Sequence, residues 1–287
     1  MNLYPIVAGN FKLDGGAMFG VVPKSLWTRT NPADENNMIN MAARCLLIED
    51  GDLLVLVDTG MGSKQSEKFF SFYFMYGDHS LEGSIKEHGF STDDITDVIL
   101  THLHFDHCGG SINWNAERTG FEPAFRNAKY WSNELHWKWA TEPNGREKAS
   151  FLKDNILPIQ ESGQLNFVAN NGDQGILQKT EILPGISAHF ANGHTEAQML
   201  PSMQYKDRTV VFVADLLPTH GHIPLPYLMG YDTRPLLTLE EKGTFLTEAA
   251  RNNYVLFLEH DPDIECITVK ETEKGVRLDE SFTLSDL

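Results

Sequence analysis

The stretch HLHFDH, residues 102–107, places three histidines and one aspartate within six positions, directly after the strand-like run DVIL. In an extended segment successive side chains alternate between faces, so His102 and His104 project the same way and can converge on one ion. Asp106 and His107 come next and can be directed at a second ion beside the first. Buried polar side chains need partners, and four of them in one short stretch have no evident use in a core. The pattern therefore favours metal binding.

Further donors are needed, because a zinc ion takes about four nitrogen, oxygen or sulfur ligands. Three ligand-type residues each follow or end a strand-like run: His194 after ISAHFA, Asp215 in TVVFVAD and His260 in YVLFLEH. A single histidine at a strand end is more often an ordinary hydrogen-bonded residue. Three donors at three strand ends are what a site assembled at one edge of a sheet requires, and we predict that they complete the metal site.

The elements that must position these residues alternate between strands and helices. Residues 45–60 read as two strands joined by a tight turn at Asp50-Gly51. A short helix is predicted over residues 80–88, and Thr238 with Glu241 predicts a capping box that starts a later helix of structural function. Further strands are predicted over residues 128–133, 186–191, 209–215, 254–260 and 266–271. This alternation is typical of a mixed α/β protein.

Composition narrows the function classes. The formal net charge of −17 would repel a polyanion, which disfavours nucleic acid as substrate or partner. No apolar run approaches the roughly 20 residues that span a membrane, and residues 1–16 do not resemble a signal peptide. An odd number of widely separated cysteines (Cys45, Cys108, Cys266) fits a reducing compartment. We expect a cytoplasmic protein with no membrane partner, folded as a single domain over residues 1–287.

The motif THLHFDHCGG, with the later GHT, VAD and LEHD, resembles the metallo-β-lactamase superfamily from about Ala43 to Asp261. The resemblance implies a four-layer αββα sandwich with two divalent metal ions, most commonly Zn²⁺, at one edge of the paired sheets. It implies that one metal is held by His102, His104 and His194, the other by Asp106, His107 and His260, and that Asp215 bridges both.

Details of the motif favour one branch of that superfamily. His104 stands where oxygen-reducing di-iron members have a glutamate, and zinc β-lactamases generally lack a bridging aspartate such as Asp215. The segments DGGAMFGVVPKSLW and ADLLPTHGH are similar to quorum-quenching lactonases of the bacillus YtnP-like branch. The implied reaction opens a lactone ring of the N-acyl homoserine lactone type by attack of a metal-bridging hydroxide. Asp106 would orient that hydroxide, and Asp215 or water would carry the proton to the leaving group.

Two other functions stay open. A phosphotriesterase, or another ester or thioester hydrolase, could use the same site, because the same nucleophile can attack phosphorus or a thioester. A non-catalytic metal-binding protein would keep the ligands and hydrolyse nothing. The lactonases that the chain resembles are often dimers, so the resemblance also implies a homodimer as a possible partner state.

Candidate substrate contacts come from two segments. Residues 1–42 form an N-terminal arm that we expect to cover the pocket, and Met18 and Phe19 could form a wall for an acyl chain. The alternative for these side chains is that they pack over the fold. Some lactonases place a tyrosine three residues after the bridging aspartate, where this chain has Pro218. Substitutes for it, or else solvated loop residues, are His220, His222 and Tyr227.

Overall fold

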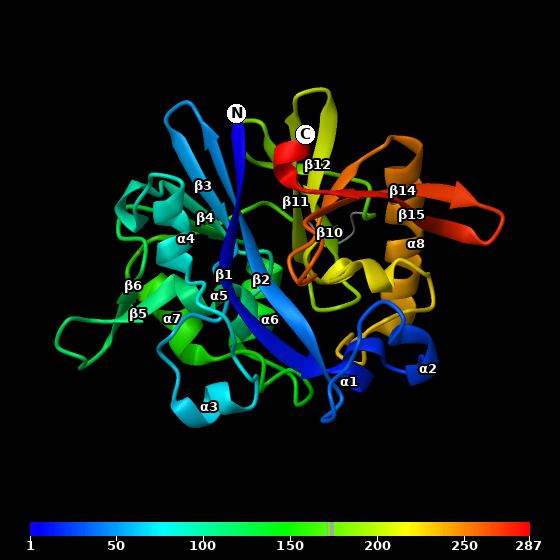
Figure 1. The fold of residues 1–287 in the computed structure, drawn as a ribbon. Helices are drawn as coiled ribbons and strands as arrows, with labels where there is room; N and C mark the ends of the chain where they lie inside the picture. Colours follow the sequence, from blue (N-terminus) through cyan, green and yellow to red (C-terminus); the bar gives the residue numbers. More distant parts are fainter. Residues whose placement is uncertain (171, 173–174) are drawn as a thin grey trace. The chain divides into compact units, whose positions relative to one another are not determined.

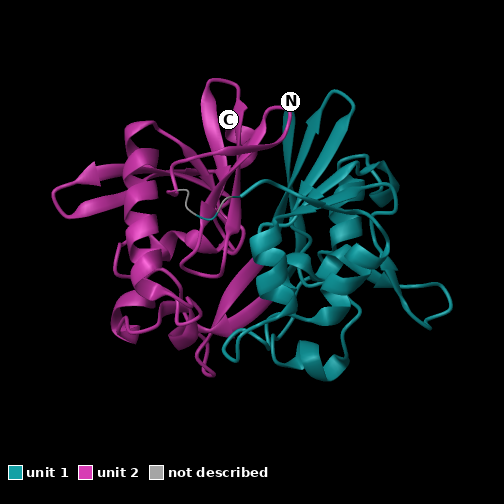
Figure 2. Ribbon diagram, turned by 180° about the vertical axis from the view of Figure 1, so that it is seen from behind, with its two compact units in different colours: residues 1–10, 43–172 teal, residues 11–42, 173–287 magenta. Residues whose placement is uncertain are grey.

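The strand-like runs assemble into two large sheets and one small hairpin in the computed structural model of the protein, which describes residues 1–170, 172 and 175–287 (Figure 1). The chain forms two compact units, each built from two separate stretches (Figure 2). Unit 1 comprises residues 1–10 and 43–172, and unit 2 comprises residues 11–42 and 173–287. Two long strands, β1 (Asn2–Asp14) and β2 (Met38–Asp50), contribute residues to both.

Unit 1 is organised around the six-stranded sheet with the order β1-β2-β3-β4-β7-β8. After β2 its strands are β3 (Leu53–Val57), β4 (Asp97–Ile99), β7 (Lys129–Ser132) and β8 (Leu165–Phe167). Strands β2 and β3 form the predicted antiparallel hairpin, with Gly51 in the left-handed region at φ 61°. Strands β3, β4, β7 and β8 run parallel. Their carboxyl ends therefore lie at the same edge of the sheet.

Short helices and one hairpin complete unit 1. The helices are α3 (Glu67–Ser71), α4 (Leu81–Glu87), α5 (Phe105–Cys108), α6 (Glu134–Thr141) and α7 (Lys153–Glu161). The hairpin joins β5 (Ile112–Trp114) and β6 (Phe121–Pro123), and a 3₁₀ turn, η2 (Gly109–Ser111), precedes it. The Ser80 hydroxyl accepts a hydrogen bond from the Gly83 amide and caps α4, which confirms the helix predicted there.

Unit 2 is organised around the seven-stranded sheet with the order β15-β14-β13-β12-β11-β10-β9. Its strands are β9 (Thr180–Leu183), β10 (Ile186–Ala191), β11 (Gln198–Tyr205), β12 (Arg208–Phe212), β13 (Val255–Phe257), β14 (Cys266–Thr272) and β15 (Gly275–Phe282). Strands β12 and β13 pair in parallel, and β10 and β12 are both antiparallel to β11. The carboxyl ends of β10, β12 and β13 consequently share one edge.

The helices of unit 2 are α1 (Gly15–Phe19), α2 (Lys24–Trp27) and α8 (Pro235–Arg251), which packs against β14 and β15 (Figure 1). The predicted capping box at Thr238 and Glu241 is wrong. Pro235 starts the helix earlier, since its fixed φ suits the first helical position. The Thr238 hydroxyl bonds to the Arg234 carbonyl one turn back, and the Glu241 carboxylate binds backbone amides outside the helix.

The mixed α/β class is confirmed, and each predicted strand is present, some with shifted ends. Within the described residues, no helix is both long and apolar enough to cross a membrane. Residues 2–14 of the predicted arm form β1. The single-domain organisation and the covering role of the arm stay predictions.

Candidate functional site

Two predicted donors of unit 1, with two polar residues that were not predicted, lie at the carboxyl edge of its parallel strands. Asp58 directly follows β3, and His102 and His104 follow β4. His136 lies in the first turn of α6, which follows β7. All four side chains are buried. The parallel order of the strands thus gathers polar groups that are far apart in the sequence.

The imidazoles of His102 and His104 converge as the spacing predicts. His102 Nε2 lies 3.0 Å from His104 Nδ1, and the two rings meet edge to face with their centroids 4.5 Å apart. His107 adds a third ring, whose centroid lies 3.9 Å from that of His102. Its Nε2 lies 4.0 Å from a carboxylate oxygen of Asp106. The sequence cluster therefore folds into one compact group of nitrogen and oxygen donors.

The Asp58 carboxylate orients this group through hydrogen bonds to Thr101 and to the Nδ1 atom of His107. Its Oδ2 accepts hydrogen bonds from the Thr101 hydroxyl at 2.6 Å and from His107 Nδ1 at 3.0 Å, and its Oδ1 accepts from the Thr101 amide at 2.8 Å. Asp58 holds a left-handed backbone with φ 58°, which a non-glycine residue adopts only at a cost. Asp58 ends the second strand-like run of residues 45–60, a position that by itself predicts no such role.

Two further unit 1 residues that the sequence did not single out contact the histidines. His136 Nε2 accepts a hydrogen bond from the Leu103 amide at 2.8 Å, which fixes the backbone between His102 and His104. Glu147 Oε1 lies 3.5 Å from His104 Nε2. Since Glu147 faces Nε2, the Nδ1 atom of His104 is the one placed beside His102. A histidine ligand commonly has such a carboxylate on its other nitrogen.

Tyr73 packs its ring against Phe105, the residue between His104 and Asp106, with centroids 4.8 Å apart. Burial, together with the nearby Asp106 carboxylate, raises the pKa of Tyr73 to about 12. The phenol therefore keeps its proton at neutral pH and can donate a hydrogen bond close to this cluster.

The glycine pair after the cluster serves close packing more than turning. Gly109 has an ordinary right-handed backbone, with φ −61°. A Cβ atom there would lie 2.1 Å from the Met61 carbonyl oxygen, and one at Gly110 would lie 2.2 Å from the Thr59 carbonyl oxygen. The pair is required because the 59–61 backbone passes directly against it. Lys64 Nζ also donates to the Gly109 carbonyl.

Unit 2 brings its three candidates together at the shared edge of β10, β12 and β13. The parallel register pairs Phe212 with Phe257, so Asp215 and His260 follow their strands by the same three residues. His260 Nε2 lies 3.1 Å from Asp215 Oδ1, and His194 Nε2 lies 3.1 Å from Asp215 Oδ2. Each oxygen of one buried carboxylate therefore faces a different histidine. Ala214 directly before it has φ 40°, a second strained position.

The outer nitrogens of these two histidines are also engaged. His194 Nδ1 lies 3.0 Å from Asp232 Oδ1, and His260 Nδ1 donates to the Ala42 carbonyl at 2.8 Å. Burial disfavours protonation of His194, yet the carboxylates of Asp215 and Asp232 raise its pKa to about 10. The electrostatic field of these two carboxylates therefore favours a positive charge beside Asp215.

The donor sets fit divalent metal ions such as zinc. Each predicted histidine donor has one ring nitrogen near an oxygen atom that can fix its tautomer, and its other ring nitrogen faces another predicted donor. The nitrogen that faces another donor is Nδ1 in His104 and Nε2 in His102, His107, His194 and His260. Neutral imidazoles and carboxylates are the ligands that zinc takes, and hydrogen bonds to the outer nitrogens fix the required tautomers.

Three of the proposed substrate contacts are packed inside unit 2. Met18 and Phe19 are both buried, and the Phe19 ring stacks on His222 with centroids 4.2 Å apart and on Trp27 at 5.2 Å. His222 Nε2 donates to the Met18 carbonyl at 2.9 Å, while its Nδ1 lies 2.8 Å from the Thr219 hydroxyl. Burial lowers the pKa of His222 to about 3, so this imidazole is neutral.

His220 and Tyr227 are more accessible. The His220 side chain is 20% exposed, and its Nδ1 lies 2.5 Å from Asp261 Oδ2. The same oxygen accepts the His220 amide at 3.0 Å. The hydrogen bond to Asp261 raises the pKa of His220. Tyr227 packs its ring edge to face with Phe19.

Comparison with known proteins assigns the family. Residues 40–260 match the model of the metallo-beta-lactamase superfamily. The chain is 25% identical over 281 residues to the N-acyl homoserine lactonase AiiA of Bacillus thuringiensis subsp. kurstaki, covering 92% of this chain and 94% of that protein. Among solved structures it is similar to a probable metal-dependent hydrolase from Staphylococcus aureus, with a TM-score of 0.86, 26% identity and coverage of 100% and 98% of the two chains. It is also similar to AidC, a dizinc quorum-quenching lactonase, with a TM-score of 0.75, 22% identity and coverage of 98% and 95%.

These matches confirm the metallo-β-lactamase fold that the motif implied. The clusters that can bind metal, the matched family model and the lactonase relatives agree on a metal-dependent hydrolase. The chain belongs to the metallo-β-lactamase superfamily.

Proposed function

We propose that this hydrolase uses two divalent metal ions to open the ring of N-acyl homoserine lactones. The observation that carries the proposal is the Asp215 carboxylate, whose two oxygens each lie 3.1 Å from a different histidine nitrogen of unit 2. A carboxylate held in this way can bridge two ions. A site for one ion would not need the two oxygens of one carboxylate to face two different histidines.

The proposed ligand sets follow the family motif. One metal takes His102, His104 and His194, the other takes Asp106, His107 and His260, and Asp215 is shared. Zinc is the metal we propose, since nitrogen and carboxylate donors suit it and AidC is described as a dizinc enzyme. When bound, the metal pair would polarise the ester carbonyl and lower the pKa of a water molecule to about 7.

The protein side chains supply orientation and proton handling. Asp58, Thr101 and Glu147 hold three histidines in the tautomers that expose the inner nitrogens. Asp106 accepts a hydrogen bond from the attacking water and directs it at the carbonyl carbon. The water oxygen bonds to the carbonyl carbon and releases one proton, and the C–O bond of the ring breaks. The leaving oxygen takes up one proton, and Asp215 and water are the candidates to carry it.

Lactones are the proposed substrate class because the matched relatives are named N-acyl homoserine lactonases, and one solved neighbour holds the product N-hexanoyl-L-homoserine at its catalytic metal centre. The substrate contacts proposed for this chain are Met18, Phe19, His220, His222 and Tyr227. A quorum-quenching role, a cytoplasmic location and a homodimer stay predictions that accompany this proposal.

A substrate comparison on the zinc-loaded chain tests the proposal. The kcat/KM value for an N-acyl homoserine lactone should exceed the values for paraoxon and for a thioester, because ring opening is the proposed primary reaction. A higher value for paraoxon would make phosphotriester hydrolysis the primary activity. Two bound metals with no turnover of any of the three substrates would indicate a non-catalytic metal-binding protein.

A further inference from the structure

The segment that carries His194 is held by buried groups of helix α8. Glu241 is buried, and its two carboxylate oxygens accept hydrogen bonds from the Asn192 amide at 2.7 Å and the Gly193 amide at 2.9 Å. Gly193 lies directly on the helix, because a Cβ atom there would meet the Thr238 nitrogen at 2.3 Å. The backbone that leads into His194 is thus fixed both by a carboxylate and by contact with the helix.

The carbonyl groups of the same segment are held by the two residues that directly precede α8. The Arg234 amide donates to the Gly193 carbonyl at 2.9 Å, and its guanidinium donates to the Asn192 carbonyl at 2.7 Å. The Thr233 amide donates to the His194 carbonyl at 3.1 Å. The amides of Asn192 and Gly193 and the carbonyls of residues 192–194 therefore bond to residues 233–241, which fix the backbone that carries His194.

The next residue of α8 holds a second loop. Lys242 is buried, and its ammonium group donates to the carbonyl oxygens of His222 at 2.9 Å, Tyr227 at 2.7 Å and Pro224 at 3.4 Å. This loop, residues 222–227, follows Asp215 in the chain and carries two proposed substrate contacts, His222 and Tyr227. A loop rich in proline, with few regular backbone partners, needs an organising donor of this kind.

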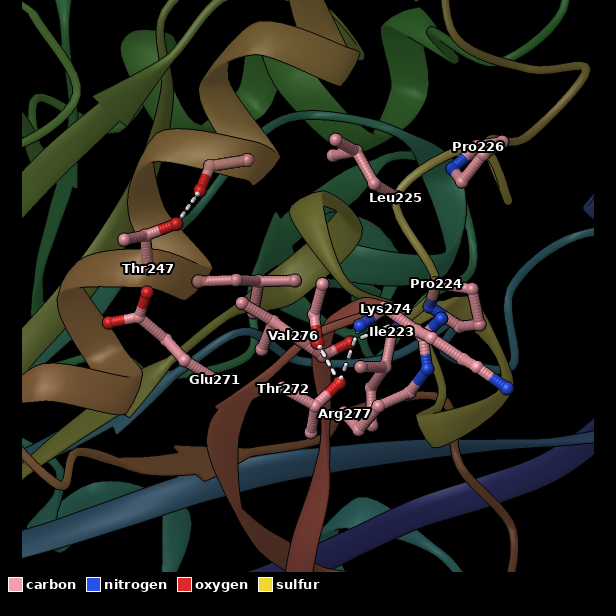
Figure 3. Close-up of a pocket in the computed structure, with 13 residues that line it drawn as sticks. Ile223, Pro224, Leu225, Pro226, Thr247, Glu271, Thr272, Lys274, Val276 and Arg277 are labelled. Carbon is pink, nitrogen blue, oxygen red and sulfur yellow. Dashed lines mark hydrogen bonds between the residues drawn. The ribbon is translucent and has the colours of Figure 1, made fainter.

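The other side of that loop forms part of a cavity. Leu225 and Pro226 line a space of about 360 Å³, opposite Thr247 of α8 and Val276 of β15 (Figure 3). Helix α8 supplies Gly243, Leu246 and Thr247 to the same wall. One side of the loop therefore faces open space, and the hydrogen bonds from Lys242 hold its backbone on the other side.

We propose that the adjacent buried charges Glu241 and Lys242 are positioning residues with separate tasks: Glu241 sets the position of the metal ligand His194, and Lys242 sets the substrate-contacting loop 222–227. The inference rests on the proposed function, because the Glu241 part uses the proposed metal ligand His194 and the Lys242 part uses the proposed substrate contacts. Neither residue is a proposed metal ligand or a proposed substrate contact. A pair with a merely structural task would lower stability when altered and would affect both metals and substrate binding alike.

Metal affinity without substrate tests the role of Glu241. In Glu241→Gln one carboxylate oxygen becomes an amide group that faces a backbone N–H donor, while the side-chain shape is kept. We expect one of the two metals to bind about 10- to 100-fold more weakly in chelator competition, with the other changed less than about 2-fold. The control is Glu240→Gln, since Glu240 is the exposed neighbour on the same helix. Unchanged affinity for both metals, or equal weakening of both with a lowered Tm, would overturn this role.

Steady-state kinetics test Lys242. Lys242→Met keeps the length of the apolar stem and removes the three ammonium hydrogen bonds. We expect KM for the lactone to rise about 10-fold or more with metal affinity unchanged, the reverse of the Glu241→Gln pattern. Both variants failing in the same way would overturn the division of tasks. Should the wild-type chain bind two metals yet hydrolyse no lactone, the proposed substrate fails while the metal result for Glu241 still decides its role.

Discussion

Asp58 offers the sharpest separation of fold stability from metal binding. Its buried carboxylate accepts three hydrogen bonds, two from Thr101 and one from His107 Nδ1. In Asp58→Ala the three donors lose their acceptor inside the protein. A buried donor left unsatisfied costs about 1–3 kcal/mol, so the free energy of unfolding should fall by about 3–6 kcal/mol after partial relaxation.

Asp58→Asn should behave differently, because the amide presents one oxygen and one NH₂ group. The oxygen can keep the bond from the Thr101 amide, and the Thr101 hydroxyl can rotate to accept from the NH₂ group. His107 can also accept from that group if its proton moves from Nδ1 to Nε2. The left-handed backbone at this position suits asparagine. We therefore expect only about 1–2 kcal/mol of lost stability.

The same tautomer change removes the lone pair from His107 Nε2, the nitrogen proposed to bind metal. Asp58→Asn should thus weaken metal binding at least 10- to 100-fold while the protein stays folded. Urea unfolding of the metal-free protein and chelator competition measure the two effects, with Asp52→Asn at the exposed hairpin turn as a control near zero. Wild-type metal affinity in Asp58→Asn, or a loss below about 1 kcal/mol in Asp58→Ala, would refute the reasoning.

Three further changes test other parts of the structure. Asp261 raises the pKa of His220, so protonated His220 stabilises the fold below its unfolded pKa of about 6.5, and this contribution is lost as pH rises through the folded value. His220→Gln should accordingly cost most near pH 6 and least near pH 9 in urea unfolding, and a pH-independent difference would contradict the pairing. Phe19→Ala should lower the free energy of unfolding by about 3–5 kcal/mol, because the buried ring stacks on Trp27; an acyl wall that contributes little to packing would give a loss under about 1 kcal/mol. Gly193→Ala should cost about 1–3 kcal/mol or more, since its methyl group would overlap α8, and an unchanged Tm would show that the segment can move away.

The candidate metal donors could be proposed from the sequence because their chemistry is local and their spacing is short. Four donors in residues 102–107, each costly to bury, point to metal without any fold. The downstream residues His194, Asp215 and His260 could be proposed because each follows a strand-like run, and parallel strands deliver such residues to one edge.

The residues that orient these candidate donors could not be found in the same way. Asp232 follows no strand, His136 lies within helix α6, and Glu147 lies in the turn between α6 and α7. Their roles depend on tertiary contacts, such as the bond from the Leu103 amide to His136. A local signal misled at Thr238 and Glu241, where a T-x-x-E pattern coincides with a helix that Pro235 had already begun. Strand β1 was also missed, because its polar and apolar residues do not alternate regularly.

Metal content together with hydrolysis tests the central claim most directly. Elemental analysis of the zinc-saturated chain should give two ions per molecule, and an N-acyl homoserine lactone should be opened by this form and left intact after chelation. Asp215→Asn and His104→Ala should each lose metal and turnover, because each removes a proposed ligand. Fewer than two ions in the saturated wild-type chain, or two ions and normal turnover in either variant, would contradict a shared two-metal centre.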